Sequence, residues 1–193
     1  MKKHRLFLLL IICIGCLLVG CSNPSNSTGG SSSENDGEIL WEKSENGYTE
    51  KIKLLETSED GIQTKAITYT ILEDATEKGV GFGILKIESN NNIVYKGAII
   101  ARRKTAAFPS GFWTHYKISC GQNRITMSDA VCAPDEEDGY YEYIVLGGIS
   151  ETQLTALKNA NQLVISLLNP SDSTRNTTFA CDYNFITNLI KYF

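Results

Sequence analysis

The chain has 193 residues, of which 18 are basic and 22 acidic, and its formal net charge at neutral pH is −4. The first 20 residues carry three of the basic residues and none of the acidic ones, so residues 21–193 have a net charge of −7. This acidic balance argues against nucleic acid as a partner and against electrostatic adhesion to an anionic bilayer.

The chain opens with the three parts of a secretory signal. Lys2, Lys3 and Arg5 form a positive start, residues 6–19 are almost wholly apolar, and Gly20 is a small residue of the kind that precedes a cleavage site. Residues 6–20 number only 15. A helix that crosses the hydrocarbon core needs about 20, so a cleaved signal is favoured over a transmembrane helix.

The signal ends in Leu18-Val19-Gly20-Cys21, which resembles the lipobox of bacterial lipoproteins. The resemblance covers residues 1–21 only. It implies cleavage before Cys21, a diacylglyceryl group on the Cys21 thiol and an extracytoplasmic domain held at the cell membrane or the outer membrane. Ser22 takes the place of the aspartate that favours retention in the inner membrane, which permits transfer to an outer membrane. Two or three acyl chains anchor a protein firmly, at about 0.8 kcal/mol per buried methylene.

Three regions follow from this pattern: the signal peptide at 1–20, a lipidated cysteine with its tether at 21–37, and one domain at 38–193. The tether is rich in Ser, Asn and Gly and has no large apolar residue after Cys21, so we expect it to be flexible. About 155 residues are enough for one domain with one core.

Most of the domain has the pattern of short strands between polar turns. The first half predicts strands at 38–43, 50–56, 65–72, 80–87 and 93–101. The second half predicts strands at 112–119, 124–127, 140–146, 163–168 and 177–181, with Gly147 and Gly148 ending the third of these. Helices are expected after Ser150, which forms a capping-box pattern with Gln153, and at 184–192. The fold class is therefore α+β, mainly an antiparallel β-sheet or sandwich with one or two short helices near the C-terminus.

Three glycines, Gly79, Gly81 and Gly83, alternate at the start of one predicted strand. They match no phosphate-binding pattern and lead into a strand rather than a helix. Glycines at this spacing lie on one face of a strand, where they allow an aromatic ring or a second backbone to approach closely.

The domain keeps three cysteines, Cys120, Cys132 and Cys181. An odd number cannot all pair within one chain. A disulfide between Cys120 and Cys132 is the favoured pairing, Cys181 with either of them is the alternative, and three buried free thiols are the third reading. No metal site and no cofactor are expected, because the domain has no CxxC and a single histidine.

That histidine, His115, is the candidate acid–base group for an extracytoplasmic hydrolase with a carboxylate partner. No GxSxG, SxxK or HExxH accompanies it, so a surface or packing role is favoured. The acidic run at 135–138 predicts a solvated loop rather than a calcium site, and the basic cluster at 102–104 would bind an anion or balance these acids across the surface.

Aromatic residues are dense around 108–116 and 140–143, and Trp113, Tyr116 and Tyr141 are the candidate binding patch for an envelope protein or a small ligand. The main hypothesis is therefore a membrane-anchored envelope lipoprotein with a non-enzymatic binding, assembly or structural role. The alternative is the hydrolase that uses His115.

Overall fold

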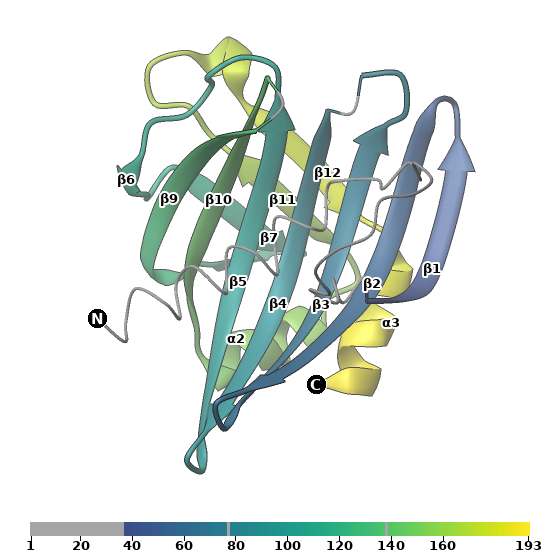
Figure 1. The fold of residues 1–193 in the computed structure, drawn as a ribbon, viewed down its shortest axis with the longest axis vertical. Helices are drawn as coiled ribbons and strands as arrows, with labels where there is room; N and C mark the ends of the chain where they lie inside the picture. Colours follow the sequence, from purple (N-terminus) through teal and green to yellow (C-terminus); the bar gives the residue numbers. More distant parts are fainter. Residues whose placement is uncertain (1–36, 77, 138) are drawn as a thin grey trace, which may run out of the picture.

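A computed structural model of the protein describes residues 37–76, 78–137 and 139–193. The expected signal, Cys21 and most of the tether lie outside these residues. The described part is mostly antiparallel β-sheet with two short α-helices, which confirms the β-rich prediction. The larger sheet has the strand order β1-β2-β3-β4-β5-β10-β9-β6 and the smaller one β12-β11-β7-β8 (Figure 1).

The bounds of the elements are as follows. The larger sheet consists of β1 (Glu38–Glu45), β2 (Tyr48–Glu59), β3 (Ile62–Glu73), β4 (Gly79–Ser89), β5 (Asn92–Arg103), β6 (Gly111–Phe112), β9 (Ser128–Glu137) and β10 (Tyr140–Ile149). The smaller sheet consists of β7 (Tyr116–Cys120), β8 (Asn123–Ile125), β11 (Leu163–Leu167) and β12 (Thr177–Cys181). The helices are α2 (Glu151–Lys158), α3 (Tyr183–Tyr192) and the 3₁₀ turn η1 (Ser173–Arg175).

Two-residue turns join the first three strands of the larger sheet. Asn46 and Gly47 connect β1 to β2 and have φ angles of 54° and 78°. Asp60 and Gly61 connect β2 to β3 with φ angles of 49° and 77°. Positive φ at both central residues is the geometry that matches the twist of two antiparallel strands, and Asn, Asp and Gly tolerate it best. These turns fix the register of the first hairpins.

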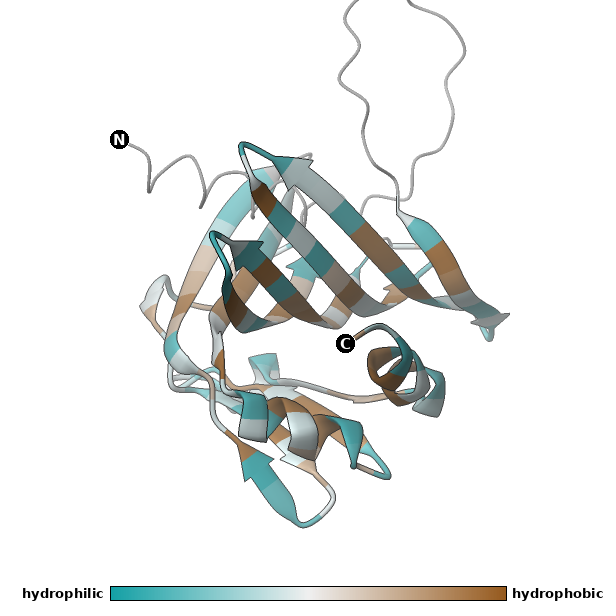
Figure 2. Ribbon diagram, turned by 90° about the horizontal axis from the view of Figure 1, so that it is seen from below, coloured by the Kyte–Doolittle hydropathy of each residue, from teal (hydrophilic) through white to brown (hydrophobic). Residues whose placement is uncertain are grey.

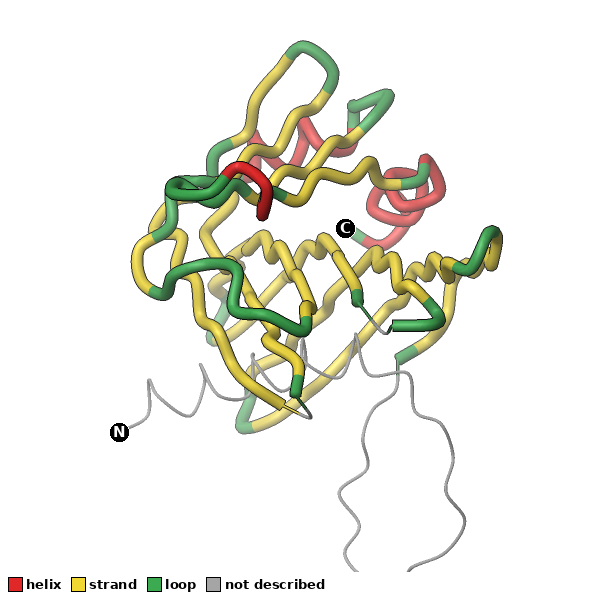
Figure 3. Tube along the Cα trace, turned by 90° about the horizontal axis from the view of Figure 1, so that it is seen from above, coloured by secondary structure: helices red, strands yellow, loops and turns green. Residues whose placement is uncertain are grey.

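The smaller sheet and both α-helices lie on one face of the larger sheet, as Figures 1 and 3 show from two directions. The main core fills the space between them. Phe185 of α3 packs its ring 5.8 Å from that of Phe82 on β4 and 6.3 Å from that of Tyr69 on β3. In Figure 2 apolar residues recur along the strands of the larger sheet and on α3. This core is a single cluster that takes buried side chains from both sheets and both helices.

Both predicted helices are present. Ser150 accepts a hydrogen bond from the backbone N–H of Gln153, and the Gln153 side chain accepts one from the backbone N–H of Ser150 at 2.9 Å. The capping box is therefore confirmed, and α2 begins one residue after Ser150. Helix α3 begins after Asp182, whose carboxylate accepts a hydrogen bond from the N–H of Asn184.

Three predicted boundaries are wrong. The strand expected at 112–119 is split, because residues 113–115 carry the chain from β6 in the larger sheet to β7 in the smaller one. Gly147 and Gly148 do not end their strand, since β10 continues to Ile149 and pairs with β5 to its end. Residues 128–137, expected to end in a solvated loop, form β9, which pairs with β10.

Candidate binding face

The larger sheet carries a second apolar cluster on the face opposite the smaller sheet, which we call the outer face. Its buried members come only from β2, β3, β4, β5 and β10: Leu55, Ala66, Leu85, Ala98, Ile100, Ile144 and Leu146. Partly buried Leu72 and Ile87 pack against them. No residue of the smaller sheet or of the described helices belongs to this cluster.

The cluster is continuous because its members are cross-strand neighbours. Leu55 pairs with Ala66, and Ala66 pairs with Leu85. On the other half of the face Ala98 pairs with Leu146 and Ile100 with Ile144. Directly opposed side chains in antiparallel strands stand about 4.5–5.5 Å apart at Cβ, so each half is a continuous apolar row. Between β4 and β5 the contact is diagonal, because Leu85 lies opposite Lys96 and Ala98 opposite Gly83. The two halves together form one cluster across five strands.

The alternating glycines lie in the middle of the outer face. Gly81 pairs with Thr70 and with Ile100, and Gly83 pairs with Thr68 and with Ala98. A Cβ at Gly81 would lie 2.9 Å from the carbonyl oxygen of Tyr69, and one at Gly83 would lie 2.9 Å from Cγ2 of Thr68. The close approach predicted for these glycines is therefore made by threonine methyl groups and backbone of β3.

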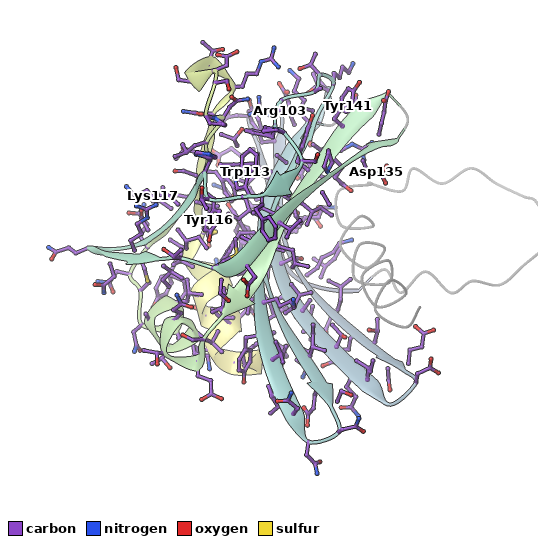
Figure 4. All side chains as sticks on the ribbon, turned by 90° about the vertical axis from the view of Figure 1, so that its left-hand side faces the viewer. Arg103, Trp113, Tyr116, Lys117, Asp135 and Tyr141 are labelled. Carbon is purple, nitrogen blue, oxygen red and sulfur yellow. The ribbon has the colours of Figure 1, made fainter. Side chains whose placement is uncertain are left out.

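The outer face has no described helix or second sheet packed on it. Its seven apolar side chains are nonetheless buried. The smaller sheet and both α-helices lie on the other side of the larger sheet, as Figure 4 shows edge-on. Apolar sheet faces are normally packed against another layer, so this face is the candidate binding surface of the domain.

Charged residues end the outer face on one side. In the sheet register Arg102 of β5 lies opposite Glu142 of β10, and Glu142 lies opposite Asp135 of β9. The Arg102 guanidinium also lies over the ring of Tyr140 at 4.7 Å, and the Lys104 ammonium does so at 5.5 Å. Of the two roles considered for the basic cluster, this arrangement favours charge balance against the acidic run.

The aromatic residues predicted as a patch do not come together on the surface. Trp113 and Tyr116 are 2% and 3% exposed and belong to the main core. The Tyr116 hydroxyl donates a hydrogen bond of 2.5 Å to the carbonyl oxygen of Met127. Tyr141 lies toward the β9–β10 hairpin end, half-buried, and its ring stacks on that of Tyr143 (Figure 4). Only Tyr141 of the three is accessible to a partner.

His115 is exposed in the loop between β6 and β7. The edge of its imidazole contacts Trp113, with 5.8 Å between ring centroids. Its backbone carbonyl accepts a hydrogen bond from the N–H of Leu168. Among the described residues no carboxylate or hydroxyl hydrogen-bonds the imidazole, so the structure does not assemble the acid–base pair that the hydrolase alternative needs.

The three cysteines of the domain are buried free thiols. Cys120 lies on β7 in the smaller sheet and Cys132 on β9 in the larger one, and the bridge predicted between them is not formed. The Cys120 thiol donates a hydrogen bond to the carbonyl oxygen of Ala156 at 2.9 Å. Burial raises the pKa of Cys132 to about 11 and also raises the pKa of Cys120 and Cys181.

These thiols are expected to be unreactive in the native protein. At pH 8 a pKa of about 11 in place of the ordinary 9.0 leaves roughly a hundredfold less thiolate at Cys132. A chromogenic disulfide reagent should therefore modify the three domain cysteines slowly in buffer and rapidly in denaturant. The Cys132 thiol ionises at its ordinary pKa of 9.0 in the unfolded chain but only at about 11 in the folded one. The free energy of unfolding should therefore fall as the pH rises from about 9 to about 11. Rapid modification of the native protein, or a bridged peptide in non-reducing mass mapping, would contradict this.

A pocket of about 350 Å³ lies at the far ends of β2, β3 and β4. Its charged lining residues include Glu56, Lys65, Lys86 and Glu88. Lys65 pairs with Glu56 at 2.6 Å and Lys86 with Glu88 at 3.0 Å. Because these charges already form ion pairs with one another, the pocket is a weaker candidate for a ligand-binding site than the outer face.

The described residues include no cluster of three or more His, Cys, Asp or Glu side chains that could hold a metal ion. Within the same part of the chain, no helix has the length and the apolar character needed to cross a membrane. No protein-family model, curated protein or solved structure matches the chain.

The sequence carries a signal for the outer face that the prediction of an aromatic patch does not use. Ala98-Ile99-Ile100-Ala101 and Ile144-Val145-Leu146 are continuous apolar runs rather than alternating ones. Such runs are typical of strands that are covered on both faces.

Proposed function

We propose that this protein is a membrane-anchored envelope lipoprotein whose extracytoplasmic β domain has a non-enzymatic binding role. The lipobox-like sequence ending at Cys21 supports the anchor. The observation that carries the binding role is the outer face, an apolar surface across five strands that none of the described helices or smaller-sheet strands covers. The membrane is therefore one partner, reached through the lipid on Cys21, and the ligand of the outer face is the other.

We also infer that the two sheets form a β-sandwich. The shared core supports this inference, since it takes side chains from the larger sheet, the smaller sheet and both helices. In a sandwich the inner faces of the two sheets pack against each other to form the core, and the outer faces are normally polar. An apolar outer face is thus the feature of this domain that most needs a functional explanation.

The hydrolase alternative has less support. It requires His115 beside a carboxylate in a pocket, whereas His115 is exposed and its described ring contact is with Trp113. A general base has to be held within hydrogen-bond reach of the group it deprotonates. We therefore assign no catalytic role to His115.

The anchor is tested by replacing Cys21. Cys21→Ala should leave an unprocessed precursor and abolish metabolic labelling with palmitate, because the alanine has no thiol to acylate. Cys16→Ala, which removes a thiol from the apolar run only five residues earlier, is the matched control and should be processed and labelled normally. Palmitate labelling of the Cys21→Ala protein would refute the anchor.

A further inference from the structure

We propose that the outer face of the larger sheet binds an acyl chain of a membrane lipid. This proposal rests on the proposed function, because it concerns the processed protein. Cleavage before Cys21 removes residues 6–19, the only strongly apolar segment before Gly37, and residues 22–36 contain no large apolar side chain. After cleavage, the segment before Gly37 therefore has no large apolar side chain that could pack on this face.

The composition of the face favours an acyl chain over a protein partner. Its seven buried members and the two that pack against them are all Leu, Ile or Ala. The centres of protein interfaces are enriched in aromatic residues, Met and Arg, which supply most binding energy there. The cluster itself has no aromatic member, and the polar side chains beside it are those of Thr68, Thr70 and Lys96. A surface that is mainly aliphatic suits a ligand that is itself mainly hydrocarbon.

The position of the tether brings this face to the bilayer. Gly37, where the described chain begins, is packed beside the outer-face residue Leu55, since a Cβ on Gly37 would lie 3.0 Å from Cγ of Leu55. Fifteen residues, 22–36, separate Gly37 from Cys21. A Ser/Gly-rich chain of this length spans roughly 19–23 Å on average. Five strands at about 4.8 Å spacing make the face about 19 Å wide, so the anchor holds it within about its own width of the lipid.

The experiment uses the mature chain without its lipid, residues 22–193, and a fluorescent long-chain fatty acid as the probe. The wild-type chain should bind the probe saturably, and Ile100→Thr/Ile144→Thr, which makes the centre of the outer face polar, should weaken binding roughly tenfold or more. The matched control is Ile93→Thr, the same change on the same strand at an exposed site outside the cluster. It should bind like wild type.

A second measurement on the wild-type chain does not depend on how the variants fold. A spin-labelled fatty acid should broaden the amide NMR signals of β3, β4, β5 and β10 and leave those of β7 and β11 sharp. Absence of saturable binding, equal binding by the double variant, or broadening confined to the smaller sheet would overturn the proposal. So would a stable dimer that excludes the probe, because a second copy would then cover the face.

The source of the acyl chain is tested with lipidated protein in vesicles. If the lipidated form binds the probe as the unlipidated form does, the face accepts a chain from membrane lipid. If lipidation alone blocks the probe, the protein's own anchor fills the face and the proposed source is wrong. A protein that binds the probe but is not labelled with palmitate at Cys21 would refute the anchor and leave acyl binding intact.

Discussion

Trp113→Ala is expected to lower the unfolding free energy by about 3–5 kcal/mol, the range for removing a fully buried large aromatic side chain. The Trp113 ring packs edge-on against Phe108 at 5.9 Å and is 2% exposed. The backbone N–H of Trp113 also donates a hydrogen bond to the carbonyl oxygen of Ala130 on β9. Trp113 therefore lies where the chain leaves the larger sheet for the smaller one. Truncation leaves a cavity that the surrounding strands cannot close.

The neighbouring residue provides a matched control. Phe112 is 85% exposed on β6, so Phe112→Ala should change the unfolding free energy by no more than about 0.5 kcal/mol. Trp113→Phe should recover much of the loss, because the indole Nε1 has no hydrogen-bond partner among the described residues. Chemical denaturation with a fluorescence or circular dichroism readout measures all three. Equal stability of the Trp113→Ala and Phe112→Ala proteins would contradict the core position of Trp113 and restore it as a surface residue.

Much of the fold follows from local chemistry that is visible in the sequence. Asn46-Gly47 and the polar run at 88–92 lie between apolar alternations, and both become tight turns because their backbones accept positive φ. The helix α2 was predicted from Ser150 and Gln153 because a capping box involves only residues three apart. The strand β12 was predicted with its observed bounds, since its buried positions alternate strictly.

The errors arise where tertiary pairing overrides the local pattern. Residues 112–119 alternate well enough for one strand, yet the chain passes between sheets at Trp113, which only the position of both sheets decides. The strand β9 was missed because its acidic end resembles a loop. It is held instead by pairing with β10, from Tyr140 opposite Glu137 to Gly148 opposite Ser128. Pairing of this kind depends on partners that have no fixed spacing in the sequence.

The candidate site was predicted less well than the fold. Aromatic density suggested a patch at Trp113, Tyr116 and Tyr141, but large aromatics are also the best core fillers, and two of these three fill the core. The outer face consists of ordinary Leu, Ile and Ala. Such residues look like core in any sequence, and only the sheet topology tells on which face they lie.

Gly147→Val is the second change with a large expected effect, a loss of about 3 kcal/mol in the unfolding free energy from overpacking. Gly147 of β10 pairs with Gly97 of β5, and Met127 lies over the pair. A Cβ at Gly147 would lie 2.7 Å from Cβ of Met127 and 2.9 Å from the carbonyl oxygen of Ser128. The second contact is with backbone, so no rotamer change relieves it, and β9 has to move away from β10.

This glycine therefore keeps β9 and β10 together rather than ending a strand. Its matched control is Gly47→Asn in the β1–β2 turn, where a Cβ would meet nothing within 4 Å and asparagine tolerates the φ of 78°. That variant should stay within about 1 kcal/mol of wild type. Thermal or urea unfolding of both proteins provides the comparison. If the Gly147→Val protein proved as stable as the Gly47→Asn protein, the close packing of Met127 and Ser128 on β10 would be wrong, and with it the continuation of β10 past Leu146.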